Sequence, residues 1–135
     1  MLIKPRLYFA HVITDYGTVF EQRALRALAD AFPDHEIINP GNPAYTDAIG
    51  VLYPLAGFEL FEAIARRCEI VVASPFPDGL HGAGVYGELK AGKAAGAQVL
   101  ELGRDYSLRI LDLDGVTPLS VAETKARVRP AKKDL

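Results

Sequence analysis

Two kinds of hydrophobic run alternate along the chain. Short, unbroken runs of apolar and aromatic residues are typical of buried strands, and the run from Glu69 to Ser74 is the clearest because it is continuous and rich in β-branched residues. Between these runs, apolar residues recur at the three- and four-residue spacing of a helix that buries one face. The strands are predicted at residues 6–11, 36–39, 69–74, 98–102 and 108–113.

Capping signals mark where the helices begin and end. Thr18 and Glu21 form a capping box, in which each side chain accepts a hydrogen bond from the other residue's backbone N–H. Behind this box, apolar residues from Ala24 to Phe32 share one face, and Pro33 ends the helix. Further helices are predicted over residues 58–67, over 85–95 before Gly96, and from a second capping box at Ser120 and Glu123 to Val128.

Strands and helices alternate through most of the sequence, which predicts the α/β class. We expect a single-domain, Rossmann-like (flavodoxin-like) three-layer sandwich with a mostly parallel sheet and right-handed crossovers. One domain spans residues 1–135 in this interpretation, with residues 130–135 as a flexible tail. The loop from Gly41 to Leu55 has no sustained period, and a loop of this length in a compact domain is usually functional or mobile. We expect it to form a lid or part of an interface.

Composition and charge narrow the classes of function. Half of the residues are hydrophobic, the formal net charge is -2, and no apolar run approaches the ~18 residues of a membrane span. No basic stripe runs through the chain outside the C-terminal tail, so duplex nucleic acid and membranes are not expected partners. The single cysteine, Cys68, cannot form an internal disulfide, and residues 1–6 lack the pattern of a signal peptide. The expected location is therefore cytoplasmic.

The ligand site is expected on the glycine-rich loop from Ser74 to Glu88. In open parallel sheets, ligands bind beyond the carboxyl ends of the strands, and this loop follows the predicted central strand. Gly79, Gly82 and Gly84 allow the backbone to approach a ligand closely. The helix that follows is expected to present free N–H groups and the positive end of its dipole to the same space.

Two carboxylates of this loop suit glycosyl chemistry. Asp78 leaves the central strand, and the side chain of Glu88 leans back from the first turns of the helix toward the loop. One carboxylate can attack the sugar carbon while the other orients a hydroxyl or handles a proton. There are simpler explanations: a glutamate near a helix N-terminus is usually there for the dipole, and Asp-Gly is usually a turn. The loop fits neither a P-loop nor the G-x-G-x-x-G fingerprint.

Several short motifs resemble the nucleoside 2-deoxyribosyltransferase superfamily, which includes nucleotide N-glycosidases. The similarity covers the order of elements from about Arg6 to Leu102. Its motifs are Tyr8-Phe-Ala-His11, Asp78-Gly79, Gly82-Ala-Gly-Val-Tyr-Gly-Glu-Leu89 and Ala91-Gly-Lys93.

The resemblance implies roles for three residues. Glu88 would be the nucleophile that forms a glycosyl-enzyme at C1′, Asp78 would contact the nucleoside, and Tyr8 would lie beside the nucleophile. The chain departs from the family pattern after the first strand, where His11-Val12 stands in place of Gly-Pro or Gly-Ser. Gly82 stands where the transferases often have an aspartate, and no clear match exists for their C-terminal asparagine.

Weaker candidates surround this set. His11 and Asp15 lie on the loop after the first strand, so either could contact the base or act as general acid, although a histidine at a strand end is often structural. His81 could bind a phosphate or donate a proton, with an exposed loop histidine as the simpler alternative. Tyr16 and Tyr86 could stack on a base, although Tyr86 could equally pack in the core. Glu62 could lie near the pocket or on the solvated face of its helix.

Two functional hypotheses follow. The first is cleavage or transfer at the N-glycosidic bond of a nucleoside or nucleoside monophosphate through Glu88, which must be deprotonated, so a raised pKa would count against this role. The alternative is a non-catalytic, Rossmann-like module that binds or senses a nucleotide. No cofactor is expected, and the histidines lack metal-ligand spacing, so no metal is expected. Family members are usually homo-oligomers, which the resemblance implies here too.

Overall fold

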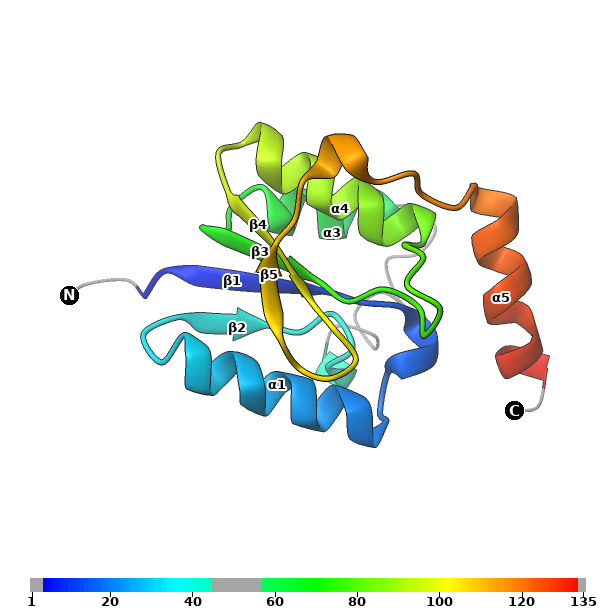
Figure 1. The fold of residues 1–135 in the computed structure, drawn as a ribbon, viewed down its shortest axis with the longest axis horizontal. Helices are drawn as coiled ribbons and strands as arrows, with labels where there is room; N and C mark the ends of the chain where they lie inside the picture. The colour runs from blue at the N-terminus through cyan, green and yellow to red at the C-terminus, as the bar shows by residue number, and fades with distance from the viewer. Residues whose placement is uncertain (1–3, 45–56, 134–135) are drawn as a thin grey trace.

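The sheet is mostly parallel, as expected. The computed structural model of the protein describes residues 4–44 and 57–133 (Figure 1). Within these residues, five strands form one sheet in the order β2-β1-β3-β4-β5, which is the flavodoxin-like order. The first four strands in that order pair in parallel, and β5 pairs antiparallel with β4. The strands are β1 (Arg6–Ala10), β2 (Glu36–Ile38), β3 (Ile70–Ala73), β4 (Gln98–Leu102) and β5 (Leu108–Ile110).

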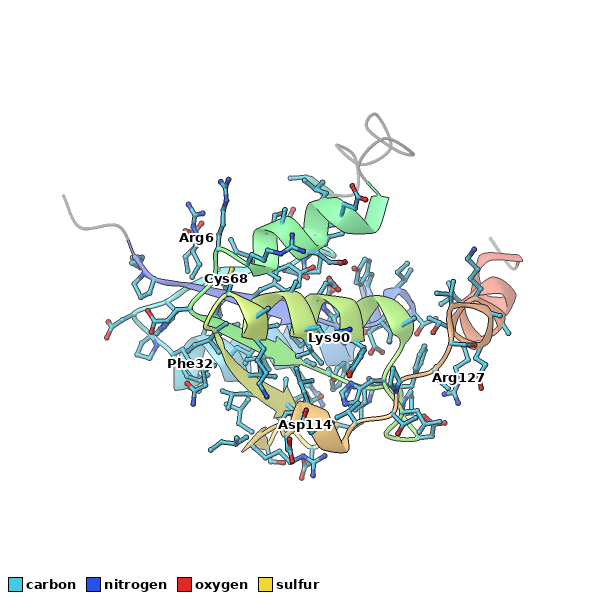
Figure 2. The ribbon with its side chains drawn as sticks, turned by 90° about the horizontal axis from the view of Figure 1, so that it is seen from above. Arg6, Phe32, Cys68, Lys90, Asp114 and Arg127 are labelled. Atoms are coloured by element: carbon cyan, nitrogen blue, oxygen red, sulfur yellow. The ribbon has the colours of Figure 1, made fainter. Side chains whose placement is uncertain are left out.

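Helices cover both faces of the sheet and complete three layers. Helix α1 lies on one face, and α3 and α4 lie side by side on the other (Figures 1 and 2). Helix α5 stands beyond the carboxyl ends of the parallel strands, where it contacts the short 3-10 helix η1 that follows β1 (Figure 1). The helical elements are η1 (Ile13–Asp15), α1 (Val19–Ala31), α3 (Gly57–Ala65), α4 (Ala83–Ala94), η2 (Leu113–Gly115) and α5 (Val121–Lys133).

Alternation along the strands divides the core between the two faces. In β1, Leu7 and Phe9 pack with Leu28 of α1 on one face, whereas Tyr8 packs with Leu89 of α4 on the other. Helix α4 packs tightly on the sheet at Gly92, where a Cβ would lie 2.5 Å from Val71 Cγ2. The period of two therefore decides which side chains of β1 can reach the helices that carry candidate residues.

The two predicted capping boxes form to different extents. The box at Ser120 and Glu123 is reciprocal, with N–H to side-chain distances of 3.0 and 3.1 Å. At α1, Thr18 Oγ1 accepts the N–H of Glu21 at 3.2 Å, but the Glu21 carboxylate accepts the N–H of Gly17 at 3.1 Å instead of the N–H of Thr18. The second half of the first predicted box is therefore wrong, because the Glu21 carboxylate is turned toward Gly17.

Element ends differ from the sequence pattern by a few residues. The strand predicted to reach Leu113 ends at Ile110, and Leu113 instead begins η2 and packs in the core. The last helix was expected to reach Val128 but runs to Lys133, which includes the first residues of the expected tail. Most of the loop from Gly41 to Leu55 lies outside the described residues. None of the described helices is long and apolar enough to span a membrane.

Candidate functional site

Tyr8 and Glu88 meet at the interface between the sheet and α4. Tyr8 is fully buried in β1, and its hydroxyl donates a hydrogen bond to Glu88 Oε1. The Tyr8 ring also packs against Phe61 of α3, with the ring centroids 6.5 Å apart. The resemblance had placed Tyr8 beside the nucleophile, and the structure brings these two side chains together across 80 residues of sequence.

The surroundings of Glu88 disfavour its charge. The pKa of Glu88 is raised to about 7, mainly by burial; the hydrogen bond from Tyr8 acts in the opposite direction, and the negative charge of Glu62 adds to the rise. Glu62 lies beside this turn of α4, since a Cβ built on Gly87 would lie at an ordinary contact distance of 3.5 Å from Glu62 Oε2. Within the described residues, no ion pair involves Glu88. Glu62 is therefore part of the candidate site, as one of its two predicted alternatives had it.

The two tyrosines of the site stay protonated. Burial, and after it the neighbouring Glu88 carboxylate, holds the pKa of Tyr8 well above its usual value, so its hydroxyl remains a hydrogen-bond donor. The pKa of Tyr16 is raised by burial and then by the charges of Glu88 and Glu21. Tyr16 thus lies within the electrostatic reach of both carboxylates and joins the Glu88 cluster to the loop after β1.

His11 is tied to the protein through both ring nitrogens. Its ring stacks on Phe9 with centroids 4.1 Å apart, and Nδ1 lies 2.9 Å from the Phe9 carbonyl oxygen. Because a carbonyl only accepts, Nδ1 must carry a proton. Nε2 lies 2.7 Å from Glu21 Oε2, within hydrogen-bond distance. Contact of a His11 nitrogen with a base would require one of these bonds to break. Glu21 is a buried partner that the sequence assigned only to helix capping.

Asp15 is buried in an ion pair that the sequence did not indicate. Arg104 binds both of its carboxylate oxygens, at 2.7 and 3.2 Å, and the Arg104 guanidinium lies 3.7 Å from the centroid of the Phe20 ring. This paired geometry suits an arginine fork and connects the turn between β4 and β5 to η1. A ligand that used Asp15 would have to compete with Arg104.

Asp78 lies in a turn, as its simpler explanation had it. Its Oδ1 accepts the N–H of Leu80 at 3.2 Å, and Oδ2 pairs with Arg127 of α5 at 2.8 Å. The hydrogen bond from Arg127, followed by the N–H of Leu80, lowers the pKa of Asp78. Gly79 beside it has φ +88°, a conformation that favours glycine. No described contact joins Asp78 to Glu88.

Helix α5 covers the start of α4. Thr124 Oγ1 accepts the N–H of Ala83 at 2.9 Å, and a Cβ on Gly82 would lie 3.2 Å from Thr124 Cγ2. The N–H of Leu119 also donates to the carbonyl of His81 at 2.9 Å. The expectation of free N–H groups at this helix start is therefore wrong at Ala83. Gly84 lies one position further along, in the first turn of α4.

His81 is buried, which overturns the simpler alternative of an exposed loop histidine. Its Nε2 lies 2.8 Å from Glu101 Oε1, and the same carboxylate pairs with Arg109. Its Nδ1 is buried without a hydrogen-bond partner among the described residues, as is Ser74 Oγ. Tyr86 is partly buried against the core, and the Lys90 ammonium lies 5.7 Å from its ring centroid.

The described side chains therefore divide into one cluster and several separate pairs. Tyr8, Tyr16 and Glu62 each interact with Glu88, and Glu21 connects Tyr16 to His11. Within the described residues, no group of three or more His, Cys, Asp or Glu side chains is arranged to hold a metal ion. Comparison with models of known protein families gives no match, and a search of curated proteins gives no relative of this chain.

Proposed function

We propose that this protein cleaves or transfers the N-glycosidic bond of a nucleoside or nucleoside monophosphate, with Glu88 as the nucleophile. The observation that carries the proposal is the hydrogen bond from the buried Tyr8 hydroxyl to the Glu88 carboxylate. This bond orients the carboxylate from one side. Membership of the nucleoside 2-deoxyribosyltransferase superfamily is part of the same proposal and rests on the quoted motifs.

The proposed reaction has two steps. A Glu88 oxygen attacks C1′ as the bond from C1′ to the base nitrogen breaks, and the leaving base takes up a proton. Water or a second base then attacks C1′ and releases the Glu88 carboxylate, and the attacking group loses its proton. Tyr8 holds the carboxylate through both steps, because its raised pKa keeps the hydroxyl in its donating form.

The raised pKa of Glu88 sets a condition on this role. A pKa of about 7 leaves the carboxylate only partly ionised at neutral pH, and attack requires the ionised form. Positive charge that develops on the sugar in the transition state favours the carboxylate. Under this proposal, the rate of base release in the free enzyme rises as the pH increases through about 7.

The other predicted residues have conditional roles in this proposal. Asp78 would contact the nucleoside only after giving up Arg127, and Asp15 only after giving up Arg104. His11 and Tyr16, which both lie next to Glu21, would contact the base and position it. We further propose a homo-oligomeric enzyme of the cytoplasm that requires no cofactor.

Release of free base tests the proposal directly. The protein is incubated with ribo- and deoxyribonucleosides and their monophosphates, with and without an acceptor base, and the products are separated by chromatography. Base release by the wild type that Glu88→Gln abolishes supports the proposal. Glu59→Gln is the matched control, since Glu59 is an exposed glutamate at the start of α3. Turnover that survives in Glu88→Gln would exclude the nucleophile assigned here.

A nucleotide-binding module is the second candidate, and the same pKa favours it. A Glu88 carboxyl group that is partly protonated near neutral pH can donate a hydrogen bond to a ligand without attacking it. The two functions separate on binding to Glu88→Gln, measured by calorimetry. An enzyme loses turnover and keeps its ligand, whereas a sensor shows no turnover in either form and loses affinity.

A further inference from the structure

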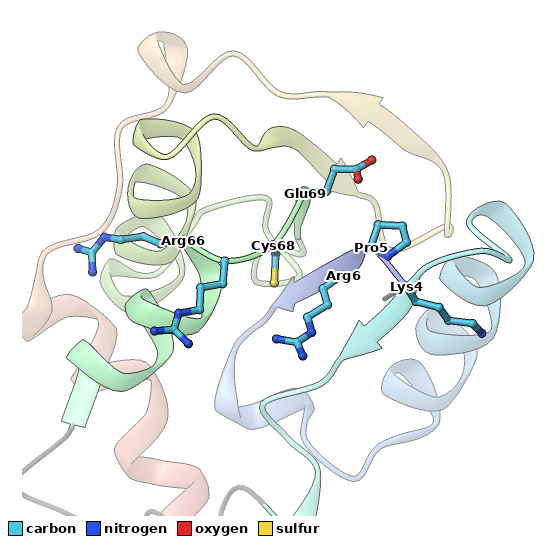
Figure 3. Close-up of a pocket in the computed structure, with 7 residues that line it drawn as sticks. Lys4, Pro5, Arg6, Arg66, Cys68 and Glu69 are labelled. Carbon is cyan, nitrogen blue, oxygen red and sulfur yellow. The ribbon is translucent and has the colours of Figure 1, made fainter. Parts of the chain in front are cut away.

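A second candidate site lies at the amino ends of the parallel strands, opposite to the ends from which the glycine-rich loop leaves. Where β1 and β3 begin and α3 ends, the surface forms an open depression of about 710 Å³ (Figure 3). It contains none of the residues that the sequence singled out for glycosyl chemistry. Its lining residues are Lys4, Pro5, Arg6, Arg66, Arg67, Cys68 and Glu69.

The lining is strongly positive in a chain whose net charge is negative. Four of its side chains are cations and one is a carboxylate. That carboxylate, on Glu69, lies 3.3 Å from the His35 ring nitrogen, and Arg6 lies 3.5 Å from Glu36. Within the described residues, no ion pair involves the other three cations, which are Lys4, Arg66 and Arg67.

Helix capping accounts for only part of this cluster. Arg66 and Arg67 follow the last turn of α3, where cations interact favourably with the helix dipole. Lys4 precedes β1 and Arg6 is its first residue, so no helix end explains their place in the same depression. Figure 3 shows Arg66 on one side and Lys4 on the other, with Arg6 and Cys68 between them.

The cysteine in the depression adds no negative charge. Burial raises the pKa of the Cys68 thiol to about 11, although the nearby Arg6 guanidinium acts in the opposite direction. Its Sγ donates to the Ile64 carbonyl at 3.4 Å. The thiol therefore stays neutral at physiological pH, and an anion in the depression would meet cations without a thiolate among them.

We propose that this depression binds a small, multiply charged anion that carries phosphate groups. Arginine guanidinium groups match the geometry of phosphate oxygens, and a lysine adds a point charge. The four cations line a single depression of about 710 Å³, which favours a compact ligand that fits within it over a long polyanion. The site is independent of the proposed glycosidic chemistry, and its test needs no turnover.

Calorimetric titration with inorganic pyrophosphate tests the site on the full chain at low ionic strength. We expect saturable binding to one site, weakened about tenfold by Arg66→Gln and by Arg67→Gln. Both arginines are exposed, so the variants should fold, and circular dichroism checks this. The matched control is Arg23→Gln with Arg26→Gln, because these exposed arginines line a different depression on α1. Affinity that falls equally in the control means non-specific attraction and overturns the proposal.

Two further outcomes would also overturn it. Absence of saturable binding by the wild type excludes a built anion site. A single-stranded oligonucleotide that binds through Arg66 and Arg67 while pyrophosphate does not would assign the surface to a nucleic acid instead. Pyrophosphate binding is expected to be lost when the salt concentration is raised to physiological strength, because the cations are exposed. This salt dependence is measured in parallel with the arginine variants, so that the effect of salt can be compared with the effect of each substitution.

Discussion

The glycine-rich segment from Ser74 to Glu88 leaves β3 and enters α4, with Asp78 in its loop and Glu88 in the helix, and these two carboxylates have opposite surroundings. Asp78 is about half exposed, accepts a backbone N–H and pairs with Arg127, and its pKa is lowered. Glu88 is partly buried, accepts a hydrogen bond from Tyr8, has no cation paired with it among the described residues, and has a raised pKa. The contacts of Asp78 thus stabilise its ionised form, whereas the surroundings of Glu88 favour its protonated form.

The difference separates a structural role from a chemical one. A salt bridge and a turn hydrogen bond satisfy Asp78 without any ligand, so its present contacts fully explain it. Burial of Glu88 and the nearby charge of Glu62 both work against ionisation of the Glu88 carboxyl group. Carboxyl groups with a raised pKa occur most often at functional sites. Glu88 is therefore the stronger candidate for chemistry, and Asp78 anchors α5 through Arg127.

The largest expected effect is on turnover. If the protein is an N-glycosidase or transferase, Glu88→Gln should lower kcat/KM for base release by about a thousandfold or more, because the nucleophile is lost. Asp78→Asn should lower kcat/KM by less than about tenfold, since both carboxylate oxygens of Asp78 already bind protein partners, Leu80 N–H and Arg127. Chromatographic assay of both variants beside the wild type measures the ratio. Equal losses in the two variants would restore Asp78 to the reacting site.

The next effect is on the pH dependence of folding stability. The folded-state pKa of Glu88 lies above its unfolded value of 4.5, so the group favours folding at low pH and loses that contribution as the pH rises through about 7. Glu88→Gln removes this dependence. Its stability relative to wild type should therefore increase between pH 4.5 and pH 8, by at most about 3 kcal/mol.

Urea unfolding of the two proteins at several pH values measures this change, with Asp78→Asn as the opposite case. The lowered pKa of Asp78 contributes stability above its unfolded value and loses it as the pH falls. The relative stability of Asp78→Asn should thus improve toward low pH. Parallel curves for both variants would mean that the two carboxylates do not differ in the way their contacts indicate.

The sequence predicted the elements and the Glu88 end of this comparison better than the Asp78 end. Parallel pairing of the first four strands in the sheet order follows from alternating strands and helices, and period-two burial in β1 places Tyr8 on the face of α4. The pairs of Asp78 with Arg127 and of Asp15 with Arg104 join segments far apart in the chain. No local spacing encodes such pairs, because they depend on how loops and α5 meet after the sheet has formed.

Burial of polar loop residues was equally hard to predict. His81 has a glycine-rich neighbourhood that is typical of an exposed loop, yet it is buried, and Glu101 of β4 lies within hydrogen-bond distance of its Nε2. The register of β3 with β4 sets Ala73 opposite Glu101, so the sheet neighbour of Glu101 on that side is a small residue. A signal for this pair would have required the strand register, which hydrophobic patterns do not supply.

A smaller effect concerns how α4 is seated, since this seating places Glu88 against Tyr8. Gly92→Ala puts a Cβ 2.5 Å from Val71 Cγ2 in the core, so it should destabilise the protein by about 1–3 kcal/mol and impair the Tyr8–Glu88 contact. Gly87→Ala is the matched control on the same helix, with its Cβ at an ordinary 3.5 Å from Glu62 Oε2. It should be neutral or stabilise by up to about 1 kcal/mol. Thermal unfolding ranks the two, and a reversed order would contradict the packing described at Gly92.

The smallest expected effect is at the Asp78 end, where α5 covers the start of α4. Thr124→Val removes the acceptor of the Ala83 N–H and keeps the bulk beside Gly82, so it should destabilise the protein by about 1 kcal/mol and speed hydrogen exchange at the Ala83 amide. Thr124→Ser retains the hydroxyl and should retain slow exchange. The Glu88 pKa, followed by NMR, should not move in either variant, because its causes lie in Tyr8, Glu62 and burial. A shift of the Glu88 pKa in Thr124→Val alone would show that the contact of α5 with the start of α4 is coupled to Glu88. The separation of an anchoring role near Asp78 from a chemical role at Glu88 would then fail.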